Sequence, residues 1–105
     1  MADIFVSYAA EDRARIEPLI EALKSEGWSI WWDRELLAGP RFAETIEHEL
    51  EAARCVVVVW SERAVTSGWC LDEAGEGLER RRLVPVRIDD VRLPLGFRSL
   101  QTASL

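Results

Sequence analysis

Apolar residues along the chain alternate between short continuous runs and helix-spaced sets, and this alternation predicts the elements. Residues 4–6 are a β-favouring run. The next apolar positions recur at i, i+3, i+4 and i+7, which is one face of a helix: Ile16, Leu19, Ile20 and Leu23. Asp12 is suited to cap this helix and Gly27 to end it. Pro18 either places the start of the regular helix near Glu17 or kinks the helix.

The middle of the chain predicts a strand, a loop, a helix and a second strand. Residues 28–32 are expected to be a strand, and residues 33–41 a loop containing the breaker pair Gly39-Pro40. A second helix is marked by its spaced apolar residues Phe42, Ile46, Leu50 and Ala53. Residues 55–60 are apolar throughout, which is typical of a central parallel strand that is buried on both faces.

The C-terminal third continues the alternation. A loop over 61–68 precedes a helix over 69–81, in which Gly75 and Gly77 each cost about 1 kcal/mol relative to alanine. Strands are expected over 83–88 and 100–105. The alternation of strands and helices implies one α/β domain over 1–105, with a parallel sheet and right-handed crossovers. Such a sheet leaves part of one face uncovered, so we expect a terminal helix beyond Leu105, in a longer protein.

Composition narrows the function classes. The 105 residues fit one domain, and a net charge of −6 lacks the basic footprint of nucleic-acid binding. No signal peptide is expected, and the longest apolar run is too short to cross a bilayer. Cys55 and Cys70 lack metal or disulfide spacing, and His48 is a single, solvated histidine. We therefore expect a cytoplasmic protein with reduced thiols, no metal, and neither nucleic acid nor membrane as a partner.

Four segments resemble one family in the correct order and spacing. Residues 3–8 (DIFVSY) resemble the opening strand of Toll/interleukin-1 receptor (TIR) domains, and residues 31–39 (WWDRELLAG) resemble their second strand and BB loop. Phe42 and the helix after it match the segment that follows this loop. Residues 67–73 (SGWCLDE) are similar to the W-C-x-x-E motif of the third helix. The resemblance extends over nearly the whole chain.

This resemblance implies a flavodoxin-like, five-stranded parallel sheet of order 2-1-3-4-5. It also implies either an enzyme that cleaves NAD+ between nicotinamide and ribose, or a non-enzymatic scaffold acting by TIR–TIR interaction. Bacterial members with W-C-x-x-E are often of the first kind, and serve antiviral defence by depleting NAD+ or by cyclising ADP-ribose. NAD+ is then the substrate, no separate cofactor is implied, and the partners are other TIR domains in a homo-oligomer or filament.

The expected sheet order places the site. Ligands of open parallel sheets bind at the carboxyl ends of strands where the connections diverge, which here lies between strands one and three. Ser7 and Tyr8 end strand one, and Trp60 and Ser61 close strand three. Glu73 starts the helix that leaves the same edge. We therefore expect the Glu73 carboxylate to face this crevice.

The residue types suit the chemistry. Trp69 and Glu73 are four residues apart and share a helix face, so the indole offers a wall for a nicotinamide or adenine ring. A carboxylate stabilises an oxocarbenium-like ribose, and nicotinamide leaves as a neutral molecule, so no general acid is required. The alternative role for Glu73 is to complement the helix dipole, which suits Asp72 better. Cys70 is expected to pack inward without a nucleophilic role.

The resemblance also assigns contacts to individual positions. It implies substrate contacts at Ser7, Tyr8, Asp33, Phe42 and Trp69, and contacts with a neighbouring TIR domain at Leu36, Leu37, Ala38 and Gly39. The alternative for Phe42 is a hydrophobic staple at the start of its helix. Ala9 and Ala10 replace the basic or hydroxyl residues of some relatives, so the pyrophosphate would rest on backbone N–H groups, Ser7 or a partner chain. A phosphoacceptor receiver domain is disfavoured because strand three ends in Trp60-Ser61 rather than in an aspartate.

Overall fold

The computed structural model describes residues 2–32, 42–97 and 102–104. It contains the three predicted helices and the predicted strands in the expected order. The elements are β1 (Ile4–Ser7), η1 (Ala10–Asp12), α1 (Arg13–Ser25), β2 (Ile30–Trp31), α2 (Phe42–Ala52), β3 (Cys55–Trp60), η3 (Ala64–Thr66), α3 (Gly68–Glu79), β4 (Leu83–Arg87) and β5 (Ala103–Ser104).

The strands form one parallel sheet of order β2-β1-β3-β4-β5. The predicted 2-1-3-4 part of this order is confirmed, and β3 lies at the centre with five of its six residues buried. Strand β2 is shorter than predicted, because it comprises Ile30–Trp31 of the expected 28–32. Of the expected strand over 100–105, the described residues Ala103 and Ser104 pair with the end of β4. Regular pairing is therefore concentrated in β1, β3 and β4.

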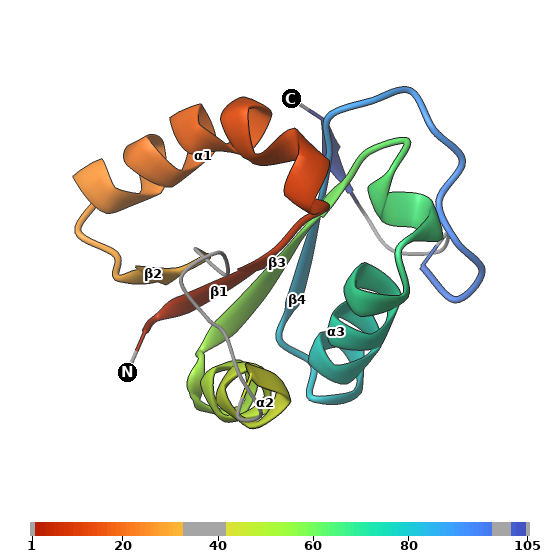
Figure 1. Cartoon of the computed structure of the whole chain (residues 1–105). Coiled ribbons are helices and arrows are strands. Elements are labelled where there is room, and N and C mark those ends of the chain that lie inside the picture. The colour runs from red at the N-terminus through yellow and green to blue at the C-terminus, as the bar shows by residue number, and fades with distance from the viewer. Residues whose placement is uncertain (1, 33–41, 98–101, 105) are drawn as a thin grey trace.

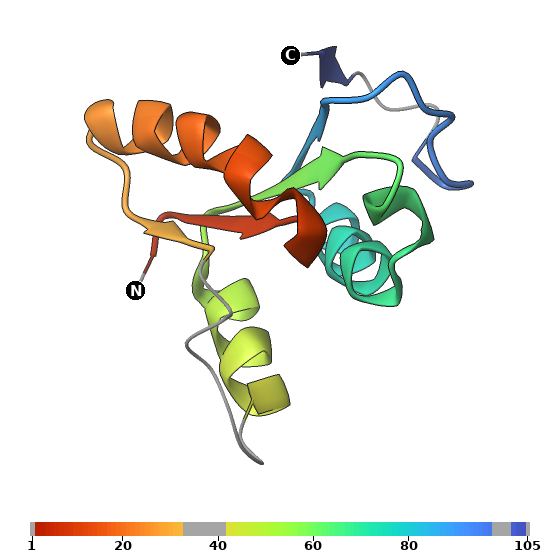
Figure 2. The same cartoon turned by 45° about the horizontal axis from the view of Figure 1, so that its top comes forward.

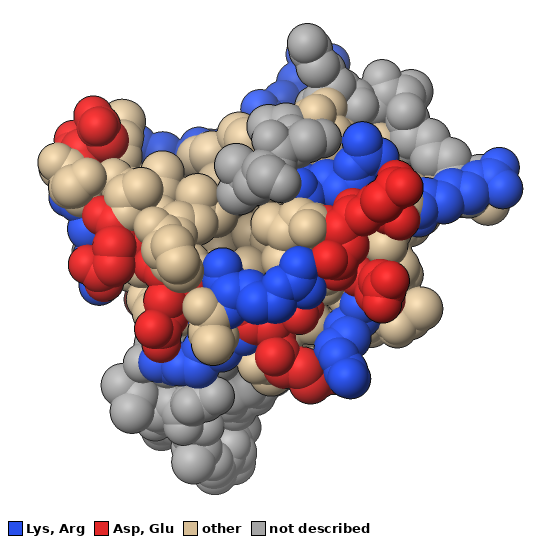
Figure 3. Space-filling view, turned by 90° about the horizontal axis from the view of Figure 1, so that it is seen from above, with Lys and Arg blue, Asp and Glu red and all other residues tan. Residues whose placement is uncertain are grey.

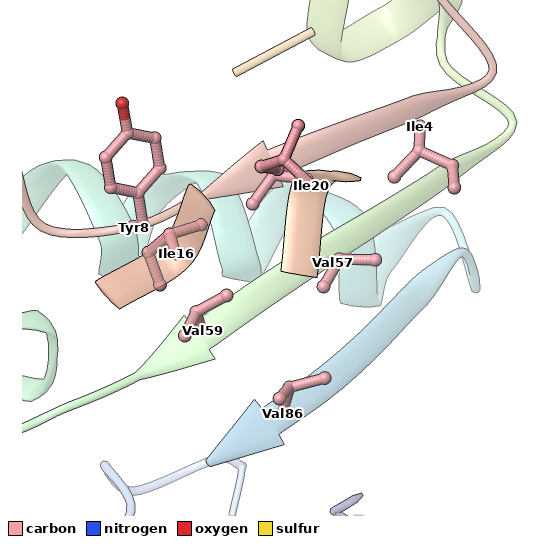
Figure 4. Close-up of a cluster of buried hydrophobic side chains, with 8 residues drawn as sticks. Ile4, Tyr8, Ile16, Ile20, Val57, Val59 and Val86 are labelled. Atoms are coloured by element: carbon pink, nitrogen blue, oxygen red, sulfur yellow. The ribbon is translucent and has the colours of Figure 1, made fainter. Parts of the chain in front are cut away.

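Helices cover both faces of the sheet (Figures 1 and 2). Helix α1 lies on one face, and α2 and α3 lie on the other. Under α1, the core is an aliphatic cluster closed by one aromatic ring, shown in Figure 4 and formed by Ile4, Val6, Tyr8, Ile16, Ile20, Val57, Val59 and Val86. Because β3 contributes alternate residues to each face, it joins this cluster to the core beneath α2 and α3.

Helix α1 starts before Glu17, which was one of the two starts considered from the sequence. It begins at Arg13, directly after the 3₁₀ turn η1, so Pro18 lies inside the helix and a start near Glu17 is ruled out. Asp12 occupies the N-cap position, but its side chain makes no capping hydrogen bond, so that part of the prediction was wrong. Gly27 follows the helix end with a φ of +94°, which confirms it as the stop.

Helix α3 approaches the sheet closely at one glycine. A Cβ built on Gly77 would lie 3.0 Å from the Cβ of Val56 on β3, whereas one on Gly75 would meet nothing within 4 Å. The structure thus separates two glycines that sequence propensity treats alike. Gly77 permits α3 to lie against β3, and Gly75 only lowers the helix propensity.

We expect alanine substitutions at these two glycines to change stability in opposite directions. Gly75→Ala should raise the free energy of unfolding by up to about 1 kcal/mol, through helix propensity. Gly77→Ala should lower it by about 1 kcal/mol or more, because the overpacking cost exceeds the same propensity gain. Urea unfolding of both variants measures this difference. A stabilised Gly77→Ala variant would show that α3 can move away from β3 at little cost.

Three further features bear on function. Within the described ranges, no helix combines the length and hydropathy needed to cross a membrane, and no group of three metal-ligating side chains comes together. Cys55 and Cys70 are both free thiols. Cys70 is fully buried, as predicted, and partial burial raises the pKa of the Cys55 thiol, which lowers its reactivity at neutral pH.

Candidate active site

The carboxylate of Glu73 lies at the interface between α3 and β1. Its side chain is 2% exposed, and the hydroxyl of Ser7 donates a hydrogen bond of 2.8 Å to its Oε1. Ser7 is the last residue of β1, and Glu73 lies in the second turn of α3, one turn before the close approach at Gly77. The end of strand one and the helix that leaves strand three therefore meet, as the sheet order predicted.

The N-terminal end of α3 is fixed by a cap that the sequence prediction did not name. The Ser67 hydroxyl accepts a hydrogen bond of 3.4 Å from the backbone N–H of Cys70. This cap stabilises the start of α3. Cys70, Glu73, Ala74 and Gly77 recur at helical spacing and form its buried face. Trp69 precedes this buried stripe and is 48% exposed. One helix thus presents a buried acid next to an accessible indole.

A hollow of about 380 Å³ opens between α2 and α3 beside these two residues. We call it the α2–α3 hollow. Its lining consists of apolar and acidic side chains, namely Ile46, Glu47, Leu50, Glu51, Trp69, Asp72, Glu73 and Glu76. Ile46 and Leu50 are buried and form an apolar floor. The volume lies in the range of small-molecule sites, although five of these eight side chains are acidic.

Tyr8 does not join this site. Consecutive residues of an extended strand point to opposite faces, so Ser7 faces α3 while Tyr8 faces α1. Its ring is 5% exposed, lies in the cluster of Figure 4, and contacts Trp32 with 5.8 Å between ring centroids. The guanidinium of Arg13 lies over the Trp32 ring, 4.6 Å from its centre. The structure therefore brings together Ser7, Trp69 and Glu73, but not Tyr8.

The other predicted site residues are described only in part. Asp33 and the loop residues Leu36, Leu37, Ala38 and Gly39 lie outside the described residues. Phe42 is the first residue of α2, but its side chain also lies outside the description. Trp60 is fully buried and packs against Phe97, with ring centroids 5.3 Å apart. Trp60 therefore belongs to the core at the end of β3.

Comparison with known proteins supplies the family. The model of the TIR domain family matches residues 4–105, which is nearly the entire chain. The chain belongs to the TIR domain family. Among solved structures, it is similar to the TIR domain of the Toll-related receptor TRR-2 of Hydra magnipapillata. The TM-score is 0.89 at 21% identity, over 99% of this chain and 84% of the other.

Plant proteins are among the relatives of this TIR domain. The disease resistance protein RPP2B of Arabidopsis thaliana is 29% identical over 82 residues, which are 76% of this chain but only 7% of that protein. The chain also matches the TIR domains of the activated Roq1 resistosome, with a TM-score of 0.71 and 30% identity. That resistosome directly recognises the pathogen effector XopQ. This match covers 88% of this chain and 60% of the other. The chain thus corresponds to one domain of much longer proteins.

A second polar cluster of the TIR domain escaped the sequence prediction. The Ser61 hydroxyl donates a hydrogen bond to the carboxylate of Asp12, and both side chains are buried. Arg15 contacts the same carboxylate at 3.3 Å and reaches Asp89, after β4, at 2.6 Å. Ser61 also accepts a hydrogen bond of 3.1 Å from the backbone N–H of Ala64. The cluster joins the start of α1 to the ends of β3 and β4. Its members come from separate segments of the sequence, and folding brings them together.

The ion pair in this cluster makes a pH-dependent contribution to stability. The Arg15 guanidinium, followed by the backbone N–H of Glu62 at 2.9 Å, holds the pKa of the Asp89 carboxyl below its usual range. A carboxyl whose pKa is lower in the folded state stabilises the fold above its unfolded pKa. That contribution disappears as the pH falls through the folded pKa.

We therefore expect Asp89→Asn to flatten the acid limb of the stability curve. Between pH 7 and about pH 4, wild type should exceed the variant in Tm by a constant amount, and below about pH 4 this difference should shrink. Thermal unfolding followed by circular dichroism at a series of pH values measures this. A difference that persists unchanged at pH 2 would mean that Asp89 acts without its charge.

Proposed function

We propose that this TIR domain is an NAD+ glycohydrolase in which Glu73 is the catalytic carboxylate. The observation that carries the proposal is a buried carboxylate on the wall of the α2–α3 hollow, hydrogen-bonded by Ser7 and next to a half-exposed indole. Fold alone does not assign chemistry, so the proposal rests on this local arrangement together with the W-C-x-x-E resemblance.

The reaction breaks the bond between the nicotinamide nitrogen and C1′ of the ribose. The bonding electrons leave with nicotinamide, which becomes neutral, and positive charge develops on the ribose ring. A carboxylate beside that ring stabilises this charge, and it does so more strongly in a site that excludes water. Water then adds to C1′ and loses a proton, which gives ADP-ribose; attack by a group of the same molecule gives a cyclised product instead.

The Ser7 hydroxyl has a positioning role in this scheme. Its 2.8 Å hydrogen bond fixes one carboxylate oxygen against the end of β1. Trp69 supplies a flat apolar surface for the departing ring. Asp33 and Phe42 remain proposed substrate contacts on the basis of the family resemblance. Tyr8 was predicted as a further contact, but its ring lies under α1, on the other face of the sheet.

We further propose that assembly of TIR domains activates the enzyme, through the loop residues Leu36, Leu37, Ala38 and Gly39. An open hollow at the surface gains from a neighbour that completes it. The similar TIR domains of Roq1 belong to an activated resistosome, which supports this part of the proposal. We place the reaction in the cytoplasm. The disease resistance proteins among the relatives support a role in defence. We place that role in a bacterium, against viruses, on the W-C-x-x-E resemblance alone.

The test is release of nicotinamide from NAD+ by the purified chain, over a range of protein concentrations that includes assembled forms. We expect release that rises more steeply than the protein concentration, and its loss in Glu73→Ala. If wild type turns over no NAD+ at any concentration yet self-associates, the chain is a scaffold that acts by TIR–TIR interaction. If Glu73→Ala is as active as wild type, the catalytic carboxylate has been misassigned.

A further inference from the structure

Two buried hydrogen bonds tie the same two segments of the chain together. One segment runs from the end of β1 to the start of α1, and the other runs from the end of β3 into α3. The Ser7 hydroxyl donates to Glu73 at one end of this contact, and the Ser61 hydroxyl donates to Asp12 at the other. All four side chains are buried. The two segments are therefore held to each other at two points.

Apolar side chains pack between these two points. Ala9 lies between Ser7 and Asp12 in the sequence and is 5% exposed. It belongs to the same buried cluster as Ala64 of η3 and Cys70 of α3. Hydrogen bonds at the border of such a cluster are stronger than hydrogen bonds in water, because the local dielectric constant is low. The contact between the two segments thus combines an apolar centre with a polar bond at each end.

A series of turns connects Ser61 to the start of α3. The Ser61 hydroxyl accepts a hydrogen bond of 3.1 Å from the backbone N–H of Ala64, and its carbonyl accepts one of 3.1 Å from that of Val65. The backbone N–H of Ser67 then donates to the carbonyl of Ala64 at 3.0 Å, and the Ser67 hydroxyl caps α3. Because consecutive turns share residues, a change in the orientation of Ser61 shifts the start of α3.

Asp12 determines the orientation of the Ser61 hydroxyl. A serine hydroxyl has one proton to donate and two lone pairs that accept. Since the proton of Ser61 points to the Asp12 carboxylate, a lone pair is left for the N–H of Ala64. Linked hydrogen bonds also polarise one another, so donation to the carboxylate makes the hydroxyl oxygen a better acceptor. The buried carboxylate therefore strengthens the hydrogen bond that begins η3.

Asp12 is held in turn from the surface. The Arg15 guanidinium lies 3.3 Å from its carboxylate, is half exposed, and also pairs with Asp89. Figure 3 shows the side of the molecule on which α1 lies, and acidic and basic side chains lie next to one another there. Asp12 thus has one partner toward the solvent and one in the interior, which fixes its side chain between them.

We propose that Asp12 and Ser61 are positioning residues for the carboxylate of Glu73. Their hydrogen bond fixes η3 and the start of α3 against the segment after β1, so that Glu73 lies where Ser7 reaches it. This inference rests on the proposed function for the reaction that Glu73 performs. It goes beyond that function by assigning a role to two buried side chains that act through η3 rather than by contact with the substrate.

The first experiment measures kcat for nicotinamide release in Ser61→Ala, in Asp12→Asn and in the double variant. Ser29→Ala is a control of the same chemistry, because the Ser29 hydroxyl donates to Asp3 at the opposite end of β1, at 3.0 Å. Ile20→Val is a control for stability, because Ile20 is fully buried under α1 and the loss of one methyl group destabilises the fold. Circular dichroism identifies a temperature at which every variant is folded.

We expect Ser61→Ala to lower kcat by about tenfold, since a small displacement of a catalytic group has effects of this order. Asp12→Asn should lower it by about threefold, because an amide oxygen still accepts the hydrogen bond. The double variant should lose no more than Ser61→Ala alone, because both residues act through one hydroxyl. Both control variants should keep the kcat of wild type. A loss of kcat in Ile20→Val equal to that in Ser61→Ala, or independent losses in the double variant, overturns the proposal.

The second experiment needs no turnover. We expect Ser61→Ala to shift the NMR resonances of the Cys70 backbone amide and of the Glu73 carboxyl carbon, and Ile20→Val to leave both in place. If Ser61→Ala does not fold, Asp12→Asn is the milder variant and should shift the same resonances. Unchanged Glu73 resonances in the folded variants overturn the proposal. If wild type releases no nicotinamide, the proposed function fails, and the spectra still decide whether Asp12 and Ser61 position Glu73.

Discussion

Glu73→Gln is expected to lower the rate of nicotinamide release by about a hundredfold or more, with little change in stability. Glutamine has nearly the same shape as glutamate, and its side-chain oxygen can still accept the hydrogen bond from Ser7. The substitution removes the negative charge, which is the property proposed to stabilise the cationic ribose, and it replaces one acceptor oxygen by an amide donor. Losses of this size follow the removal of a single group that stabilises transition-state charge.

Initial rates of nicotinamide formation measure this effect, and thermal unfolding by circular dichroism confirms that the fold is intact. Glu79→Gln serves as the matched control and should retain full activity, because it removes the same charge from the exposed end of the same helix. A Glu73→Gln variant that retains most of its activity would show that position 73 needs shape and hydrogen bonding rather than charge. Glutamine thus separates two roles that alanine removes together.

Trp69→Ala is expected to raise KM for NAD+ by about tenfold to a hundredfold, since stacking of a base on an aromatic side chain contributes about 1–3 kcal/mol. The chain contains a matched control. Trp28 is 47% exposed and Trp69 is 48% exposed, but only Trp69 lines the α2–α3 hollow. Truncation of either indole removes a similar accessible surface, and thermal unfolding of both variants reports their effects on stability.

Steady-state kinetics of both alanine variants test this. Trp28→Ala should have wild-type KM and kcat, while Trp69→Ala should have a raised KM and a smaller change in kcat. Equal kinetic effects of the two substitutions would contradict a substrate contact at Trp69. A loss confined to kcat would instead indicate that the indole acts on Glu73 and not on the substrate.

The elements that the sequence predicted well are those whose pattern depends on burial. The apolar run over Cys55–Trp60 has no polar alternation, and it is the central strand because only such a strand is buried on both faces. The position of Glu73 followed from the sheet order, since a helix that leaves strand three must begin at the edge where strand one ends. The first inference needs only periodicity, and the second also uses the sheet order that the family resemblance implies.

The sequence could not determine which face a residue at the end of a strand presents. Ser7 and Tyr8 were predicted to share the crevice, yet the pleat sends them to opposite faces. The role of Asp12 was also hidden, because its partners Ser61 and Arg15 belong to different elements and a capping role satisfied the local pattern. The short length of β2 was not predicted for a similar reason: pairing at the edge of a sheet depends on the neighbouring strand, which residue propensities do not describe.

The hydrogen bond between Ser7 and Glu73 spans 66 positions of sequence. Such a contact closes a long loop, and it requires that β1 and α3 are both in place. A chain still emerging from the ribosome, or one cut before α3, therefore holds no ordered carboxylate at the end of β1. The carboxylate that we propose as catalytic is thus positioned only once α3 has docked on the sheet.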